Sequence, residues 1–382
     1  MKKTGLLILV LLLFGWCSIP AYAQNEQDVS QQEDYQQIAD DIAQEIESAT
    51  DDDVNRILQE QEISLEKPES ISKISIGSVI ESIVSSFTDV LKKPMVMLGK
   101  IIVITILCVV AKSLAPEASS VTRTFNIIAV LSIITVMFDT IYSSVEVIRS
   151  SLERLSEFMM AYIPVFSSIV AVGGSVTASG SYYATTLFIC EMIGYISNHV
   201  IMPFLSIVLA TSLVSAINPN LQFSGTSESI KKACQWIMGG MMTIFVGLLT
   251  IQGFSGTATD SLATRAVKFA ASSFIPVIGG AVSEAYSTIH SSVGVIRTGL
   301  GTIGIIIICI MVLKPILSII AIKFIISLSQ MISDLFGQKE CSEFLKSTNA
   351  VMSIGLSVVI CFSLVFVIAT ALLMLTAMNI GV

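Results

Sequence analysis

The chain has 382 residues, of which 53% are apolar and only 13% are charged. This balance is typical of an integral membrane protein and unlike that of a soluble domain of the same length. The formal net charge is -8 and no basic cluster occurs, which argues against nucleic-acid binding because that function needs a positive surface to neutralise phosphates.

The first residues have the pattern of a secretory signal peptide. Lys2 and Lys3 precede an apolar core, and Ala21-Tyr22-Ala23 forms a small-x-small cleavage site, so residues 1–23 are expected to be removed after Ala23. Two alternatives are disfavoured. Trp16 stands where a lipoprotein signal at Cys17 would need a small residue, and the apolar core is too short for a comfortable uncleaved anchor. The mature N-terminus is therefore expected to be extracytoplasmic.

The next two segments are polar and then amphipathic. Residues 24–70 contain fifteen Asp or Glu but only Arg56 and Lys67 as basic residues, so we expect an acidic extracytoplasmic segment with short helices and disorder. Residues 71–94 place Ile, Phe and Val side chains on one helical face. This pattern predicts an amphipathic helix at the membrane surface or against a partner.

The rest of the chain predicts an all-α polytopic membrane protein with about six to eight transmembrane or re-entrant helices. We expect a first helix pair over residues 95–142 and two repeats over 143–254 and 255–382, with amphipathic interfacial helices between the spans. One of these helices alternates charged and apolar residues between Val145 and Met159. The expected loop from Lys112 to Arg123 contains a single acidic residue and is placed in the cytoplasm by the positive-inside rule.

Two motifs recur at one displacement and indicate an internal repeat. Ile163-Pro164-Val165 returns as Ile275-Pro276-Val277, and the Pro-x-Leu-Ser-Ile motif at Pro203 returns at Pro315. We therefore expect a duplicated unit that contains an interfacial helix, an Ile-Pro-Val hairpin, a long Pro-interrupted helix, a polar loop and a membrane helix.

Both Ile-Pro-Val motifs are followed by paired glycines. Proline and glycine pairs permit a helix to break at membrane depth, and paired breaks are typical of transporter and channel cores, although two ordinary kinked helices would also fit. Charges within the apolar spans are further candidates; they are Lys100, Lys112, Asp139, Glu191, Lys314 and Lys323. The candidate pore or interface residues are Glu191, Pro164, Gly173, Gly174, Pro276, Gly279, Gly280, Pro203 and Pro315.

The residues needed for catalysis are scarce. The chain has two histidines, His199 and His290, and its cysteines form no Cys-x-x-Cys pair, so we expect no enzyme activity, no metal site and no cofactor. The glycines from Gly299 to Gly304 match a dinucleotide fingerprint by spacing. Because they lie in an apolar run with no strand before them, close helix packing explains them better.

The signal peptide, the acidic cysteine-free segment, the amphipathic helix and the duplicated Ile-Pro-Val and Pro-x-Leu-Ser-Ile body together resemble the stage III sporulation protein AE family. The resemblance implies a multi-pass protein of the mother-cell membrane around the forespore. It also implies membership of a trans-envelope channel or secretion-like complex with the other stage III A proteins and stage II sporulation protein Q, and a homo-oligomeric state. A secondary transporter or permease for a small solute, with Glu191 in its mechanism, is the alternative.

Overall fold

The computed structural model describes Thr50, Asn55 and residues 76–113, 120–217, 224–274 and 279–378. The signal-peptide residues Ala21 and Ala23, nearly all of the acidic segment and Pro276 lie outside these described residues. The chain divides into two units, Met1–Asp41 and Ile42–Val382, and every described residue belongs to the second.

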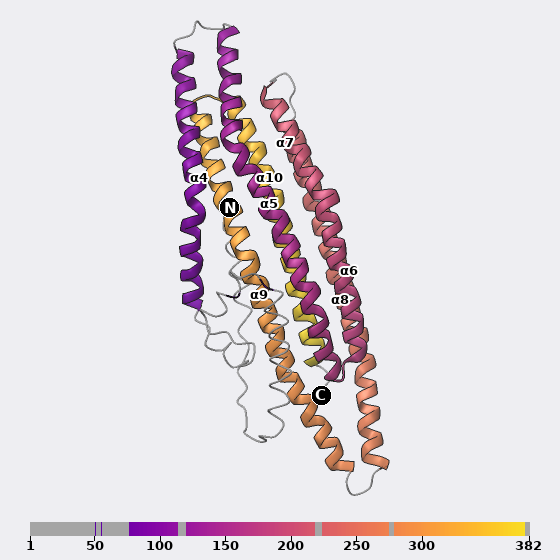
Figure 1. Cartoon of the computed structure of the whole chain (residues 1–382). Coiled ribbons are helices and arrows are strands. Elements are labelled where there is room, and N and C mark those ends of the chain that lie inside the picture. Colours follow the sequence, from indigo (N-terminus) through magenta and orange to yellow (C-terminus); the bar gives the residue numbers. More distant parts are fainter. Residues whose placement is uncertain are drawn as a thin grey trace. The chain divides into compact units, whose positions relative to one another are not determined.

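The described residues confirm the all-α prediction, because the described stretches between Ile76 and Met378 are helical apart from the turns at residues 173–175 and 336–338 (Figure 1). The elements in chain order are α4 (Ile76–Ser113), α5 (Ser120–Val172), α6 (Val176–Ile196), the π-helical turn η2 (Ser197–Ile201), α7 (Met202–Ile217), α8 (Ser224–Phe274), α9 (Gly279–Leu335) and α10 (Lys339–Met378). Six of the described helical stretches are long and apolar enough to cross a membrane. The chain is therefore a multi-pass membrane protein.

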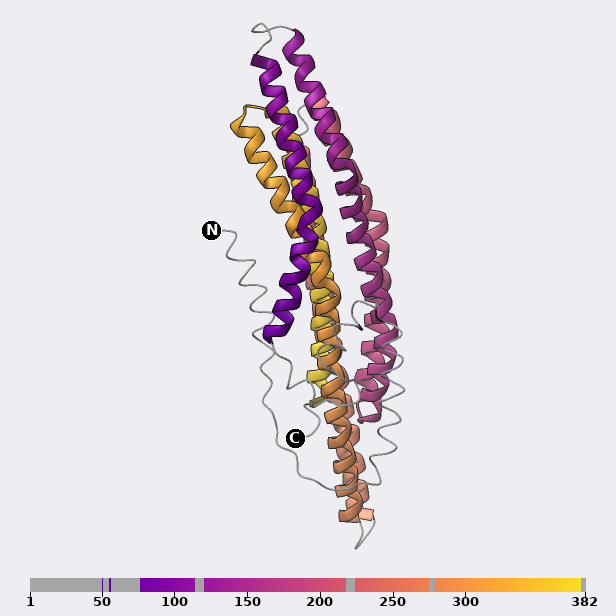
Figure 2. The same ribbon diagram turned by 60° about the vertical axis from the view of Figure 1, so that its left-hand side comes forward.

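The apolar stretch of α10 is the most enclosed helical segment. It packs against α5, α7, α8 and α9, and 56% of its apolar stretch is buried, more than for any other candidate span among the described residues. Figures 1 and 2 both show α9 and α10 running side by side. Aromatic side chains fill the contact between these helices and α5, where Phe158, Tyr162 and Phe166 are fully buried in a stacked row.

Two short turns end helices in the same way. The turn from α5 to α6 places Gly174 at φ 83, and the turn from α9 to α10 places Gly337 at φ 67. In the first turn Gly174 N–H donates to Ala171 O and Ser175 N–H donates to Val170 O. This hydrogen-bond pattern is a Schellman motif, which satisfies the last carbonyls of a helix and favours glycine in its left-handed position.

The structure corrects the expected position of the first break. Pro164 lies inside the continuous helix α5, and the chain reverses only at Gly173 and Gly174. The amphipathic run from Val145 to Met159 is likewise part of α5 rather than a separate helix. The expected segment boundaries after residues 94, 142 and 254 fall within α4, α5 and α8, and the division into repeats stays a prediction.

Candidate functional site

An exposed polar stripe lies in the middle of the rod formed by α6, η2 and α7. Glu191, Tyr195 and His199 are exposed and follow each other at one-turn spacing. The Tyr195 and His199 rings stack with centroids 4.5 Å apart, and His199 Nδ1 donates to Tyr195 O at 3.1 Å. Glu191 therefore faces outward and lines no cavity formed by the described residues.

The position of Glu191 makes its exposure costly in a bilayer. The apolar stretch runs from Val176 to Ser215, so Glu191 lies about 22 Å from one end and about 36 Å from the other at 1.5 Å per residue. The stretch is about twice as long as the roughly 30 Å hydrocarbon core of a bilayer, and a carboxylate that lies inside the core would contact acyl chains unless it is shielded. Either protein or water must therefore cover this part of the rod.

The π-helical turn lies next to Pro203. Pro203 is the second residue of α7, and η2 ends two residues before it at Ile201. Proline lacks the N–H that would close the preceding turn, and single π turns are a common accommodation within α-helices and occur frequently at functional sites. The π-helical turn lies on the same rod as the polar stripe, and a functional role of Pro203 stays a prediction.

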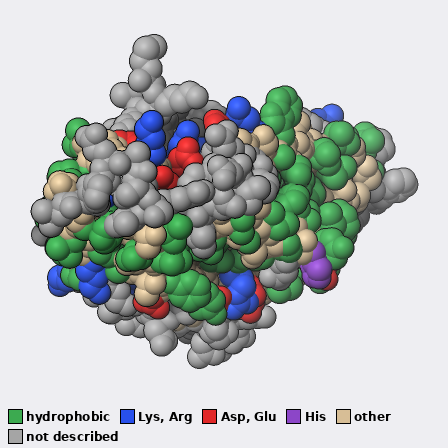
Figure 3. All heavy atoms as spheres, turned by 90° about the horizontal axis from the view of Figure 1, so that it is seen from above, with side chains coloured by type: hydrophobic (Ala, Val, Ile, Leu, Met, Phe, Trp, Pro, Cys, Tyr) green, Lys and Arg blue, Asp and Glu red, His purple; other side chains and the backbone are tan. Residues whose placement is uncertain are grey.

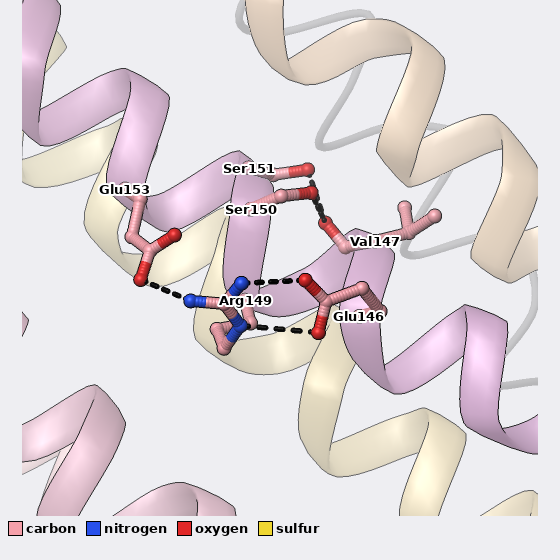
Figure 4. Close-up of polar contacts among 6 residues, drawn as sticks. All are labelled: Glu146, Val147, Arg149, Ser150, Ser151 and Glu153. Atoms are coloured by element: carbon pink, nitrogen blue, oxygen red, sulfur yellow. Dashed lines mark hydrogen bonds and ion pairs between the residues drawn. The ribbon is translucent and has the colours of Figure 1, made fainter.

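A second group of exposed charges lies midway along α5 (Figure 4). Arg149 bridges two acids of its own helix: its Nη2 is 2.5 Å from Glu146 Oε1, its Nε donates to Glu146 Oε2 at 3.1 Å, and its Nη1 contacts Glu153. Arg154 and Glu157 are exposed on the following turns. On the inner side of this segment, the buried Ser156 lies beside Cys190 of α6. The charged segment of α5 therefore lies at a similar position along the helix bundle to Glu191.

The predicted close packing at the glycine motif is confirmed. A Cβ atom at Gly304 would lie 2.4 Å from Tyr162 Cζ, and one at Gly301 would lie 3.1 Å from Phe166 Cζ. Tyr162 also donates a hydrogen bond to Leu300 O at 3.1 Å. The helix segment around Pro164 thus packs directly on the glycines of α9.

A carboxylate from α8 caps the start of α6. Asp260, which is 4% exposed, accepts hydrogen bonds from Thr177 N–H at 3.0 Å and Ala178 N–H at 2.9 Å. Ser175, the N-cap residue, makes no side-chain capping bond. Gly256, one turn before Asp260, permits the approach, because a Cβ there would lie 2.5 Å from Ala178 Cα. The acid satisfies amides that lack partners within the helix and interacts favourably with the helix dipole.

Polar side chains also connect α9 with α10. Lys323 Nζ donates to Ser353 Oγ, and one turn away Asn349 Nδ2 donates to Ser327 Oγ at 3.0 Å. At the adjoining end of the bundle, Lys112 Nζ donates to Gln338 Oε1 at 2.8 Å. These contacts give two lysines from apolar spans neutral hydrogen-bonding partners, which is how intramembrane cations are commonly accommodated.

Arg297 is the most unusual charged residue in the described part of the chain. It is 3% exposed, its Nε has no hydrogen-bond partner, and no described acid forms an ion pair with it. A buried charge without a partner costs several kcal/mol. Arg297 lies at the start of the apolar stretch of α9, between Ile296 and Leu335.

The described residues give little support for metal-dependent chemistry. No group of three or more His, Cys, Asp or Glu residues there could hold a metal ion. A small cavity between α6, α8 and α10 measures about 10 Å³ and is lined mainly by apolar side chains. That volume is about enough for one water molecule.

The family comparison matches residues 63–377 to the model of stage III sporulation protein AE. The chain belongs to the stage III sporulation protein AE family. One relative is the stage III sporulation protein AE of Bacillus subtilis (strain 168), which is 23% identical over 243 residues. That match covers 63% of this chain and 61% of the relative. No solved structure matches.

The resemblance inferred from the sequence is thereby confirmed. The family is named for sporulation and for the stage III A set of sporulation proteins. The family is not a known enzyme family.

The candidate residues of this family member fall in several places. Glu191 and Pro203 share one rod, while Pro164, Gly173 and Gly174 lie along the end of α5 and its turn. Pro315 is buried inside α9, and Gly279 and Gly280 begin that helix. The structure does not gather these residues into one pocket among the described residues.

Two charged residues escaped the sequence analysis of this family member. Neither Asp260 nor Arg297 was among the charges expected within apolar spans, yet they lie near the ends of the apolar stretches Glu228–Ala263 and Ile296–Leu335. The helices continue through both positions. A search for isolated charges within one or two turns of each span end would have found them.

Proposed function

We propose that this chain is a non-enzymatic membrane component of a trans-envelope channel or secretion-like complex that links the mother cell with the forespore and supports forespore development. It would reside in the mother-cell membrane around the forespore with its mature N-terminus extracytoplasmic. Its partners would be other stage III A proteins, stage II sporulation protein Q and further copies of itself.

The exposed Glu191 stripe is the observation that carries this proposal. A carboxylate and an imidazole lie on the outer surface of an apolar helical rod, with the charged segment of α5 close in height. A lone protein in lipid would leave these groups in contact with acyl chains at a large energetic cost. In a complex, side chains of neighbouring subunits or a shared water-filled passage would cover them.

A secondary transporter receives less support. Such proteins bind their solute in a cavity between helices near the bilayer midplane. Among the described residues, the cavity between α6, α8 and α10 measures only about 10 Å³, and Glu191 is exposed on the outside. A solute would therefore need a site that several chains build together.

A pull-down from sporulating cells tests the proposal. The tagged chain, solubilised in mild detergent, should co-purify with other stage III A proteins, and deletion of its gene should block forespore development. Vesicles that contain only the purified chain should take up no solute, with or without Glu191→Gln. Purification of the chain alone together with normal sporulation in the deletion strain would refute the assembly role. Autonomous uptake abolished by Glu191→Gln would favour the transporter.

A further inference from the structure

The outer surface of α4 and α5 has an extended apolar area with two isolated charges. Its exposed members, called here the α4–α5 face, include Val96, Val103, Leu107, Ile128, Phe138 and Tyr142. On each helix they are four, seven or ten residues apart, which is close to one, two or three helical turns, so each helix contributes one stripe. Figure 3 views the molecule from above and shows a surface on which a few charged groups lie among broad apolar areas.

A groove separates the two stripes. It measures about 390 Å³ and is lined by Val96, Gly99, Lys100, Val103 and Ile104 of α4 and by Val136 of α5. No atom of the described residues lies within 4 Å of the position that a Cβ of Gly99 would occupy. The groove is therefore open beside a glycine, and another helix could approach α4 closely there.

Lys100 and Asp139 are the charges on this face. Both are exposed, and neither forms an ion pair or a hydrogen bond with another described residue. Lys100 lies within the apolar stretch Pro94–Ser113, and Asp139 lies within Ile127–Val172. Unpaired charges in such stretches are unfavourable and usually find a partner of opposite sign.

The two charges lie at similar heights along the bundle. Val136, three residues from Asp139, lines the same groove as Lys100. Cys108 of α4 contacts Phe125 O of α5 at 3.6 Å. At 1.5 Å per residue, these two contacts place Lys100 and Asp139 about 5–9 Å apart along the helix axes. The length of a lysine side chain covers such an offset.

We propose that the α4–α5 face binds the same face of a second copy, with Lys100 of each copy paired to Asp139 of the other. Copies inserted in the same orientation are related by a two-fold axis parallel to the helices. Such an axis places a residue of one copy opposite the residues of the other copy that lie at the same position along the helices. An isologous contact then brings residue i against j and j against i. Because Lys100 and Asp139 lie at similar positions along the helices, the dimer contains the Lys100–Asp139 ion pair twice.

The pairing also covers the apolar stripes whether they face lipid or water. In lipid it neutralises two charges, and in water it removes large apolar side chains from solvent. The proposal deepens the assembly role suggested above by naming a surface for self-association. It can be tested separately, because the purified chain suffices and no sporulation partner is needed.

Charge reversal distinguishes pairing between copies from pairing within one copy. Lys100→Asp creates two Asp–Asp contacts in a homodimer, and Asp139→Lys creates two Lys–Lys contacts. A mixture of the two variants restores opposite charges at both contacts of a heterodimer. An ion pair within one chain would stay broken in both variants, so mixing would not help it.

The measurement is the monomer–dimer equilibrium of differently tagged full-length chains in detergent, by analytical ultracentrifugation and tag co-capture. Each single variant should dimerise about 100-fold or more weakly than the natural chain, because two pairs are lost. The mixture of the two should recover most of the affinity. Gly99→Leu should also weaken dimerisation while helical circular dichroism stays unchanged, since the space around Gly99 is open within one copy.

Three outcomes would overturn the inference. They are a monomeric natural chain at all concentrations, single variants that dimerise like the natural chain, and a mixture that stays as weak as its components. A matched change on another helix, Lys232→Asp, serves as a control because Lys232 is exposed on α8. It should leave dimerisation unchanged. Failure of these tests would leave the pull-down with other sporulation proteins unaffected, so the two proposals can fail independently.

Discussion

Replacement of Gly304 by alanine tests the contact that joins α5 to α9. The new Cβ would lie 2.4 Å from Tyr162 Cζ, more than 1 Å inside the usual carbon–carbon contact distance of about 3.5–4.0 Å. Tyr162 has little freedom to move, because Phe158 and Phe166 stack on it with ring centroids 5.4 Å away. Its hydroxyl is also held by Leu300 O at 3.1 Å.

The expected free-energy change follows from three contributions. Overpacking of a filled core costs about 1–3 kcal/mol, and loss of the Tyr162 hydrogen bond adds about 1 kcal/mol. The better helix propensity of alanine offsets about 1 kcal/mol. Gly304→Ala should therefore lower the free energy of unfolding by about 1–3 kcal/mol. The assay is reversible unfolding in mixed micelles, followed by circular dichroism.

Two further variants make this prediction specific. Gly247→Ala is the matched control, since Gly247 lies within α8 with nothing within 4 Å of its Cβ position; it should be neutral or slightly stabilising. Tyr162→Leu provides room, so the double variant with Gly304→Ala should lose less stability than the sum of the two single variants. If Gly304→Ala matched the natural chain, or if the two changes were additive, the packing argument would be wrong.

Three other substitutions test the remaining buried features, each by the same unfolding measurement. Asp260→Ala should lower the free energy of unfolding by about 1–2 kcal/mol because it leaves the Thr177 and Ala178 amides uncapped. Asp260→Asn should lower it less because one acceptor oxygen remains, and equal losses for the two variants would contradict the capping role. Gly355→Ala should be destabilising because its Cβ would lie 2.1 Å from Ile148 Cδ1, and Ile148→Val, which removes that methyl, should rescue it; a failed rescue would refute the contact. Arg297→Met should raise the free energy of unfolding because it removes a buried cation without a described partner; a loss of stability would show that the guanidinium is paired in the folded protein.

Hydropathy was sufficient to predict the helical class because a bilayer allows few alternatives. Long apolar runs in a chain with few charges must satisfy their backbone groups internally, and the six stretches long and apolar enough to cross a membrane follow from that constraint. The glycine motif at Gly301 and Gly304 could also be interpreted correctly, because small residues in an apolar helix permit close packing. Its partner, Tyr162, could not be found from the sequence, since 142 positions separate Tyr162 from Gly304 and no local pattern relates them.

The candidate site was harder to predict because exposure depends on which helices surround a residue. Glu191 and Lys323 both occur in apolar spans, but Glu191 faces outward while Lys323 binds Ser353 of α10. In the sequence, both residues look like isolated charges in an apolar run. Only the packing of α9 against α10 distinguishes a charge that has a partner within the chain from one that still needs a partner.

The two Ile-Pro-Val motifs show how packing can override a local signal. A proline disfavours helix at the residue before it and removes one backbone hydrogen bond, so both motifs predict a break. Yet α5 continues through Pro164 for eight further residues; the second motif lies outside the described residues. Ile163, within the first motif, and Phe166, just after it, are fully buried. Their van der Waals contacts with neighbouring helices offset the cost of about 3 kcal/mol for proline within a helix, so the helix persists until the left-handed glycine turn ends it.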